Sequence, residues 1–262
     1  MLSWPIIKHS FGRTLLQPGL LFAGIVQVAV LLFFLFGIYF KLDHGEIVSI
    51  TIFNHETEQV PTYQNIMLPS LAESLHYGLM FFFIVGMAGL FTEDLKDPFL
   101  GVVLARAHSR EEFFLSEFAG IVLASLASLL LFSMLICIIL SAKLDALLFT
   151  PILGALSFTG EVIILLTVCS FFAVLVGSST AVIILGVIIY FFLGPLLMLI
   201  EKTDNLTLSF VPYLIPPMGK FYTITQGLLL GKPVSVTEFL KGAIQASVYL
   251  GIACFLFSRR DV

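Results

Sequence analysis

The chain has 262 residues, of which 59% are hydrophobic and 11% charged, and its mean hydropathy is +1.07. Soluble domains carry about 25% charged and about 45–50% apolar residues, so this chain has too few polar side chains to cover a soluble globule. The formal charge of −4 is small and indicates no particular class of partner. The composition therefore predicts an all-α polytopic membrane protein.

The cysteines give no sign of a disulfide framework or a thiolate metal site. Cys137, Cys169 and Cys254 all fall inside apolar runs, and the sequence contains no Cys-x-x-Cys spacing.

The first 18 residues are typical of a helix that lies in the membrane interface. Their apolar side chains recur at helical spacing, at Trp4, Ile7, Phe11 and Leu15. A tryptophan, an apolar face and the two cations Lys8 and Arg13 suit the headgroup region. We expect an interfacial helix over residues 1–18; the alternative is an unstructured basic tail.

Six apolar runs have the length of membrane spans, which need about 20 residues to cross about 30 Å of hydrocarbon. They are residues 20–40, 71–91, 118–140, 149–176, 181–200 and 241–257. The start of the fourth run is ambiguous, near Phe149 or near Glu161, because Pro151 and Gly154 interrupt it. The first run begins only at Leu20 and no small-residue cleavage site follows it, so we expect no cleavable signal peptide.

Small residues and one amide within these runs indicate helix packing. Two stripes repeat every four residues, Gly120, Ala124 and Ser128 in the third run and Ala243, Ser247 and Gly251 in the sixth. Such stripes let helices approach closely. Gln27 is costly in hydrocarbon unless it is hydrogen-bonded, so we expect it to face other helices.

The two long polar connections lie between runs one and two and between runs five and six. In residues 41–70, the β-branched stretch Ile47–Phe53 followed by Asn54-His55 predicts a short external strand or hairpin. Four side chains there could in principle ligate a metal, His44, Glu46, His55 and Glu56, but their spacing favours solvated loop residues. In residues 201–240, the apolar part 210–231 is broken by prolines at 212, 216 and 217. We expect re-entrant or interfacial helices there.

An even number of spans puts both termini on one side of the membrane. All five arginines, at positions 13, 106, 110, 259 and 260, fall on that side together with the segment between runs two and three. The positive-inside rule therefore predicts cytoplasmic termini. We expect the chain in the cytoplasmic (inner) membrane.

The segment Thr92–Glu117 is the most informative part of the chain. It holds many of the charged residues, yet Leu95, Phe99, Val102 and Val103 recur at helical spacing, which indicates a short amphipathic helix. A turn at Ala107–Ser109 follows, and Arg110 opens the next helix. The segment is either a solvated loop or a docking hairpin for a soluble partner, and we favour the hairpin.

The sequence carries no recognisable catalytic site. The Glu111-Glu112 pair lacks the arginine that intramembrane proteases of the CAAX type place four residues later, since Ser116 occupies that position. All five histidines precede residue 109, which disfavours a rhomboid-like pair. The Gly227–Lys232 stretch has the wrong spacing for a phosphate loop. We expect no enzyme activity and no cofactor in this chain.

The layout and two motifs resemble the ABC-2 type permeases, the six-helix membrane subunits of ABC exporters. The first motif has the acidic pair Glu93-Asp94, the apolar stretch Phe99–Leu104 and Ser109-Arg110, with Phe113-Phe114 beyond. The second is the ending Phe257-Ser-Arg259-Arg260-Asp261. The chain departs from the family pattern at Asp97-Pro98, Ala107-His108 and Ser116-Glu117.

The resemblance implies a permease that pairs with a second permease, either a copy or a homologue, and with cytoplasmic ATPase subunits, which bind ATP and Mg. The hairpin would be the coupling helix seated on the ATPase. Its contact residues would be Glu93, Asp94, Leu95, Asp97, Phe99, Val102, Val103, Arg106 and Arg110. Such families export lipids, glycans, peptides or drugs, and the sequence does not specify the substrate. The alternative function is a non-transporting scaffold or assembly factor, for example in maturation of an extracytoplasmic metalloenzyme.

Overall fold

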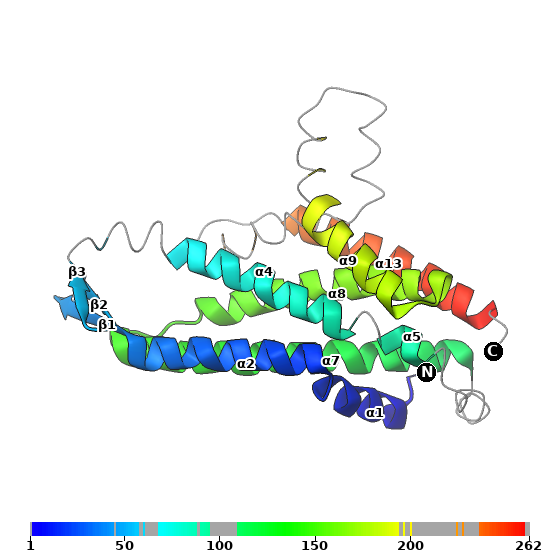
Figure 1. The fold of residues 1–262 in the computed structure, drawn as a ribbon, viewed down its shortest axis with the longest axis horizontal. Coiled ribbons are helices and arrows are strands. Elements are labelled where there is room, and N and C mark those ends of the chain that lie inside the picture. Colours follow the sequence, from blue (N-terminus) through cyan, green and yellow to red (C-terminus); the bar gives the residue numbers. More distant parts are fainter. Residues whose placement is uncertain are drawn as a thin grey trace.

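The structure of the protein is a computed structural model, and most of the chain folds as helices (Figure 1). It describes residues 2–44, 46–57, 60, 68–87, 90–94, 109–193, 196, 200, 224, 227 and 236–259. The long helices are α2 (Pro18–Leu32, continued by the π-helix η1, Phe33–Gly37), α4 (Leu68–Met87), α7 (Arg110–Leu144), α8 (Thr150–Val176) and α13 (Val236–Arg259). The shorter ones are α1 (Trp4–Leu15), α5 (Leu90–Asp94) and α9 (Ser179–Ile188, continued by the π-helix η3, Ile189–Leu193).

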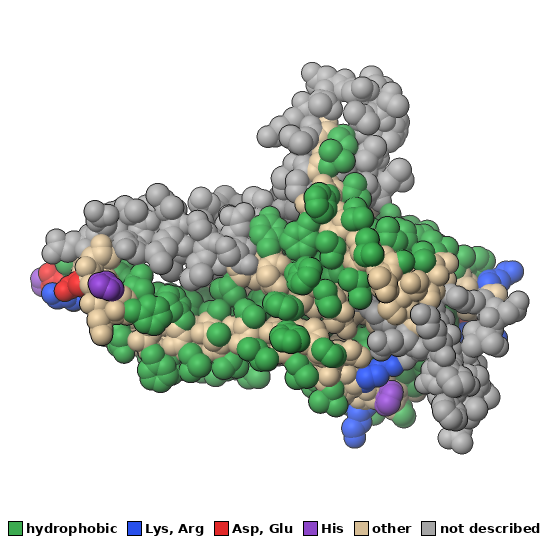
Figure 2. All heavy atoms as spheres, viewed as in Figure 1, with side chains coloured by type: hydrophobic (Ala, Val, Ile, Leu, Met, Phe, Trp, Pro, Cys, Tyr) green, Lys and Arg blue, Asp and Glu red, His purple; other side chains and the backbone are tan. Residues whose placement is uncertain are grey.

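Within the described residues, 5 helices are long and apolar enough to cross a membrane. The prediction of a helical protein with several apolar spans is confirmed at this level. The fifth predicted span, 181–200, corresponds to the shorter apolar helix Ser179–Leu193. The predicted re-entrant part, 210–231, lies outside the described residues apart from positions 224 and 227. Figure 2 shows hydrophobic side chains over the middle of the molecule and charged side chains toward its two ends, as expected for membrane insertion.

The helix α7 begins earlier than the predicted span 118–140 and continues beyond it. The Ser109 hydroxyl accepts a hydrogen bond from Glu112 N at 3.0 Å, and Glu111 and Glu112 occupy the first turn. An N-cap and acidic residues both stabilise a helix start, and the prediction that Arg110 opens this helix is confirmed. At the other end, Asp145 adopts a left-handed conformation (φ 48°) that terminates the helix. With 35 residues, α7 is about 52 Å long, which exceeds the hydrocarbon thickness of about 30 Å.

The first span ends sooner than predicted, because residues 38–40 form a strand instead of helix. A three-stranded antiparallel sheet follows Gly37, with β1 (Ile38–Asp43), β2 (Glu46–Ile52) and β3 (His55–Thr57) in that order. The predicted strand over Ile47–Phe53 is confirmed as β2, which runs from Glu46 to Ile52, whereas β1 was missed. Lys143 from the end of α7 donates to the carbonyls of Leu35 and Ile38 and lies over the Tyr39 ring. A distant lysine thus satisfies carbonyls that the ending helix leaves open.

The fourth predicted span, 149–176, agrees with α8, so of the two predicted starts the one near Phe149 is correct. The sixth, 241–257, lies inside the longer α13. In the second, 71–91, the helix α4 ends at Met87, and α5 begins at Leu90.

The two small-residue stripes have different environments. Gly120 and Ala124 in α7 are buried, and an added Cβ at Gly120 would lie 2.7 Å from the Ile7 carbonyl oxygen. The predicted close packing of α7 is therefore confirmed, with α1 as the partner. The α13 stripe is exposed within this chain, and no heavy atom lies within 4 Å of an added Cβ at Gly251. Gln27 is 6% exposed and accepts a hydrogen bond from Ser128 at 3.2 Å, which confirms its predicted orientation toward other helices.

Two glycines let α2 and α4 cross with their backbones in contact. A Cβ added at Gly19 would lie 2.3 Å from the Cα of Gly86, and one added at Gly86 would lie 2.8 Å from the Cα of Gly19. Backbone atoms cannot rotate away as a flexible side chain can, so neither position accommodates a larger residue. This crossing fixes the position of α4 against the first span.

We predict that Gly19→Ala destabilises the protein by about 1–3 kcal/mol, the usual range for an overpacked contact. Gly24→Ala in the same helix is the matched control, because no heavy atom lies within 4 Å of its added Cβ. Thermal unfolding of both variants in detergent measures the difference. Equal unfolding temperatures would contradict the backbone contact.

Candidate functional site

The sequence-predicted partner-binding residues are only partly described. Leu95, Asp97, Phe99, Val102, Val103 and Arg106 lie outside the described residues. Glu93 and Asp94 end α5, with side chains also outside the description, and Arg110 is the first residue of α7. The structure therefore describes what holds the segment 95–108 at both ends. We call this assembly the loop frame and define it as α5, residues 109–120, α1 and Phe257.

The segment is preceded in the chain by α5, whose first three residues are buried. Leu90 and Phe91 are 1% and 3% exposed, and Thr92 is fully buried. The hydroxyls of Thr92 and Ser179, the first residue of α9, lie 2.6 Å apart and share a hydrogen bond. This pair ties the start of the segment to α9.

The segment is followed in the chain by α7, and aromatic rings join the start of α7 to α5. The Phe91 ring lies 5.7 Å from that of Phe114 and 6.2 Å from that of Phe118. Phe257 near the end of α13 stacks on Phe113 and Phe114, with ring centroids 6.2 Å and 5.2 Å away. Aromatic pairs at these separations contribute about 0.5–1.5 kcal/mol each beyond their burial. One aromatic cluster therefore links both ends of the segment to the end of α13.

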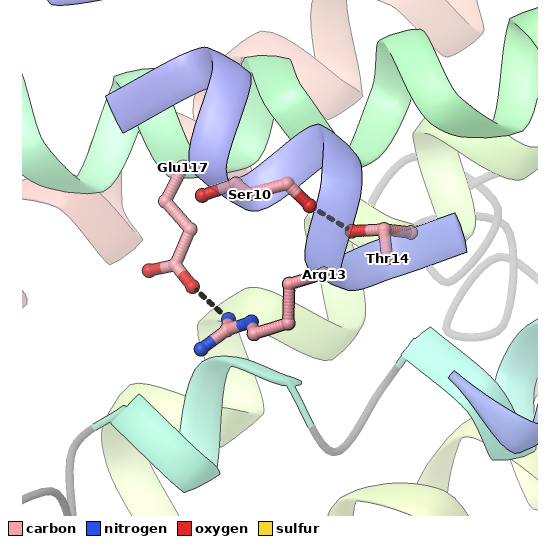
Figure 3. Close-up of polar contacts among 4 residues, drawn as sticks. All are labelled: Ser10, Arg13, Thr14 and Glu117. Carbon is pink, nitrogen blue, oxygen red and sulfur yellow. Dashed lines mark hydrogen bonds and ion pairs between the residues drawn. The ribbon is translucent and has the colours of Figure 1, made fainter. Parts of the chain in front are cut away.

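The helix α1 packs across the first turns of α7 with a small, polar face. Ile7, Ser10 and Thr14 are buried, and Thr14 donates to the Ser10 carbonyl at 2.6 Å (Figure 3). Ser116 accepts a hydrogen bond from the Ser3 backbone N–H at 2.8 Å. A helix is present at Trp4–Leu15, within the predicted range 1–18. Ile7 and Trp4 were predicted to share one face, but Ile7 is buried and Trp4 is exposed.

An ion pair fastens α1 to α7. Arg13 Nη2 lies 2.6 Å from Glu117 Oε1, and the two side chains come from different helices (Figure 3). The Glu117 side chain is 3% exposed and that of Arg13 is 26% exposed. A carboxylate so deeply buried needs its partner, because removal of one member of a buried pair is strongly destabilising.

The outward face of α1 remains apolar and cationic. Trp4 and Leu15 are 68% and 37% exposed, and the exposed residues Lys8 and His9 lie on the same helix. A helix with exposed tryptophan, leucine and lysine is suited to the headgroup layer of a bilayer.

Sequence reasoning missed the residues that build the frame. Glu117 and Ser116 were visible only as departures from the family pattern, and Phe91 and Thr92 carried no motif. The available signal was charge: Glu117 is followed by a long uncharged run, so a cation elsewhere in the chain had to neutralise it.

Searches against protein-family models and against curated proteins find no match for this chain.

We predict that Arg13→Leu destabilises the protein by about 2 kcal/mol, less than the roughly 3–5 kcal/mol of a fully buried pair, because Arg13 is partly solvated. Glu117→Gln should cost less, since it removes the buried charge. The double variant Arg13→Met/Glu117→Met should recover much of the loss.

Thermal unfolding and proteolysis between α1 and α2 measure these effects. Lys8→Leu is the matched control, an exposed cation on the same helix. If Arg13→Leu behaved like Lys8→Leu, the ion pair would have no structural role.

Proposed function

We propose that this chain is the membrane-spanning permease subunit of an ATP-driven exporter of the ABC-2 type. A separate ATPase subunit would hydrolyse ATP with Mg, and the segment 95–108 would dock on it from the cytoplasmic side. The complex would contain two permeases and two ATPases. The observation that carries the proposal is the loop frame, in which one aromatic cluster holds both ends of the charged segment.

The loop frame contains more contacts than a simple loop between two spans requires. A solvated loop between two spans requires only that its ends be within reach of each other. Here α5, α7 and α13 meet through Phe91, Phe114 and Phe257, and Thr92 adds a hydrogen bond to α9. A displacement of the segment would therefore be transmitted to several spans at once. Coupling to a separate ATPase subunit requires such transmission.

The length of α7 supports a docking position outside the bilayer. Its first turns carry Arg110, Glu111, Glu112 and Glu117, and its uncharged part begins after them. A helix of about 52 Å extends beyond about 30 Å of hydrocarbon. The apolar residues predicted for the segment, led by Phe99, would then stand clear of lipid and need a protein surface to cover them.

The orientation of the chain is part of the proposal. The sheet β1–β3 lies at one end of the molecule, and α1, the start of α7 and the end of α13 lie at the other (Figure 1). The arginine distribution places the second end in the cytoplasm.

We predict that cysteines introduced at Glu56 and Ser109 react from opposite sides of the membrane. In intact cells, an impermeant thiol reagent should label the cysteine at Glu56 and spare the one at Ser109 until the cells are opened. The chain without an introduced cysteine controls for Cys137, Cys169 and Cys254. The reverse pattern would invert the orientation, and labelling of both sites from outside would reject it.

We predict that Phe99→Ala weakens binding of the ATPase subunit about 30-fold, as truncation of an aromatic anchor costs about 2 kcal/mol. Arg110→Glu should weaken it as well. The measurements are co-purification of the ATPase in mild detergent and stimulation of its hydrolysis by the permease. Phe149→Ala is the matched control, because Phe149 is 65% exposed in the connection between α7 and α8.

The same experiment separates the exporter from the scaffold alternative. An exporter requires an ATPase that co-purifies and responds to the permease. If no ATPase accompanies the wild-type chain, or if both variants retain wild-type association and hydrolysis, the docking role is rejected.

A further inference from the structure

A cluster of buried ionisable side chains lies between α4, α8 and η3, outside the loop frame. Glu161 of α8 is 0% exposed, Tyr190 of η3 is 5% exposed and His76 of α4 is 8% exposed. The helices α4, α8 and α9 pack on one another, and Tyr190 in η3, the continuation of α9, contacts His76 of α4. The proposed docking function uses none of these residues.

The histidine is the centre of the cluster. His76 Nε2 lies 2.9 Å from Glu161 Oε2 and 3.0 Å from the Tyr190 hydroxyl. Neither oxygen of the Glu161 carboxylate has a hydrogen-bond partner among the described residues, so the contact with His76 is a close ion-pair contact without hydrogen-bond geometry. Aromatic rings enclose the imidazole, with Phe158 at 4.6 Å and Tyr77 at 5.7 Å between ring centroids.

The position of Glu161 makes its charge state important. It lies within an apolar helix, and nearby residues of α8, including Val162, Leu165 and Leu166, are also buried. An unpaired carboxylate in such surroundings is strongly disfavoured, and ionisable groups inside membrane helices are rare and usually functional. His76 is the one described side chain placed to neutralise it.

A histidine and a glutamate in contact have zero net charge when they hold one proton between them, whichever group carries it. Loss of that proton leaves a lone carboxylate, and gain of another leaves a lone imidazolium. Both states place a net charge in the low-dielectric interior. The pair therefore favours a single bound proton. Because a proton binds to an existing side-chain atom, such a site requires no cavity.

We propose that His76 and Glu161 form a proton-binding site, and that separation of α4 from α8 and η3 releases the shared proton near neutral pH. The site goes beyond the proposed docking function and couples the position of α4 to proton exchange. Tyr190 orients His76, and its place in a π-helix fits the frequent occurrence of π-turns at functional sites.

The direction of the pH effect follows from counting protons. Separated, hydrated glutamate and histidine side chains change protonation near about pH 4.3 and about pH 6.5. Between these values the packed and separated pairs each hold one proton. Above about pH 6.5 the separated pair holds none, and its proton has passed from the imidazole nitrogen to water. Separation therefore becomes easier as the pH rises above that value.

Among the other titratable groups on the packed elements, Glu73 of α4 is near His76 along the sequence, three residues before it, and its side chain lies outside the described residues. The charged residues described in α7 lie at its ends, and α13 has Glu238 and Lys241 near its start. The full set for the described parts of the packed elements is Tyr77, Cys137, Lys143, Cys169, Tyr190, Glu238, Lys241, Tyr249, Cys254, Arg259 and the charged residues of 110–117. No ion pair joins any of them to Glu161 within these described elements.

The first test compares the unfolding temperatures of the wild-type chain and Glu161→Gln between about pH 5.5 and about pH 8.5 in detergent. The advantage of the wild type should shrink by about 5 °C as the pH rises, because only the wild type loses a shared proton. Glu117→Gln is the control: the partner of Glu117 is an arginine, a residue type that stays protonated throughout this range, so the difference between the wild type and this variant should stay constant. A constant difference for Glu161→Gln as well would reject the proposal.

The second test uses the wild-type protein, so its result does not depend on whether a variant folds. Nuclear magnetic resonance of wild-type protein labelled in histidine side chains and glutamate carboxyl groups counts the protons on the pair. His44 is the internal control, since its side chain is 96% exposed. At about pH 7.5 the His76–Glu161 pair should still hold one proton. A neutral His76 beside an ionised Glu161 at that pH would overturn the proposal.

Discussion

Polar groups among apolar helices have no water to solvate them, and this constraint organises the whole molecule. Several buried polar side chains contact a polar group on another element. Gln27 bonds to Ser128, Glu117 pairs with Arg13, and His76 contacts both Glu161 and Tyr190. Because a wrong helix arrangement would leave such groups unpaired, these contacts select one packing among many apolar alternatives.

The loop frame and the buried proton site share a structural element. The short helix α9 contacts α5 through Ser179 at its start, and its π-helical continuation contacts α4 through Tyr190. Because α4 and α5 follow each other in the chain, α9 and η3 together contact two parts of one continuous stretch: α9 contacts α5, and η3 contacts α4. A displacement of the segment 95–108 would thus have a direct physical route to the His76–Glu161 pair.

The ends of the helices depend on contacts as specific as those in the interior. Ser109 caps α7 locally, but Lys143 reaches the carbonyls of Leu35 and Ile38 from a different helix. Phe53 donates its backbone N–H to the Gly37 carbonyl at 2.9 Å, which seats the sheet on the end of the first span. The sheet and the first span are therefore one structural unit, in which β1 follows η1 directly in the chain.

The sequence by itself determined what depends on neighbouring residues: long apolar runs, the helix start at Arg110, and the β-branched strand near Ile47. Hydropathy and capping act over a few turns, so their pattern is readable along the chain. Only the tertiary structure decided where the first span stops and which helix faces Gly120. It alone paired Arg13 with Glu117 and His76 with Glu161. These partners are far apart in the sequence, and burial makes their pairing necessary only once the helices have packed.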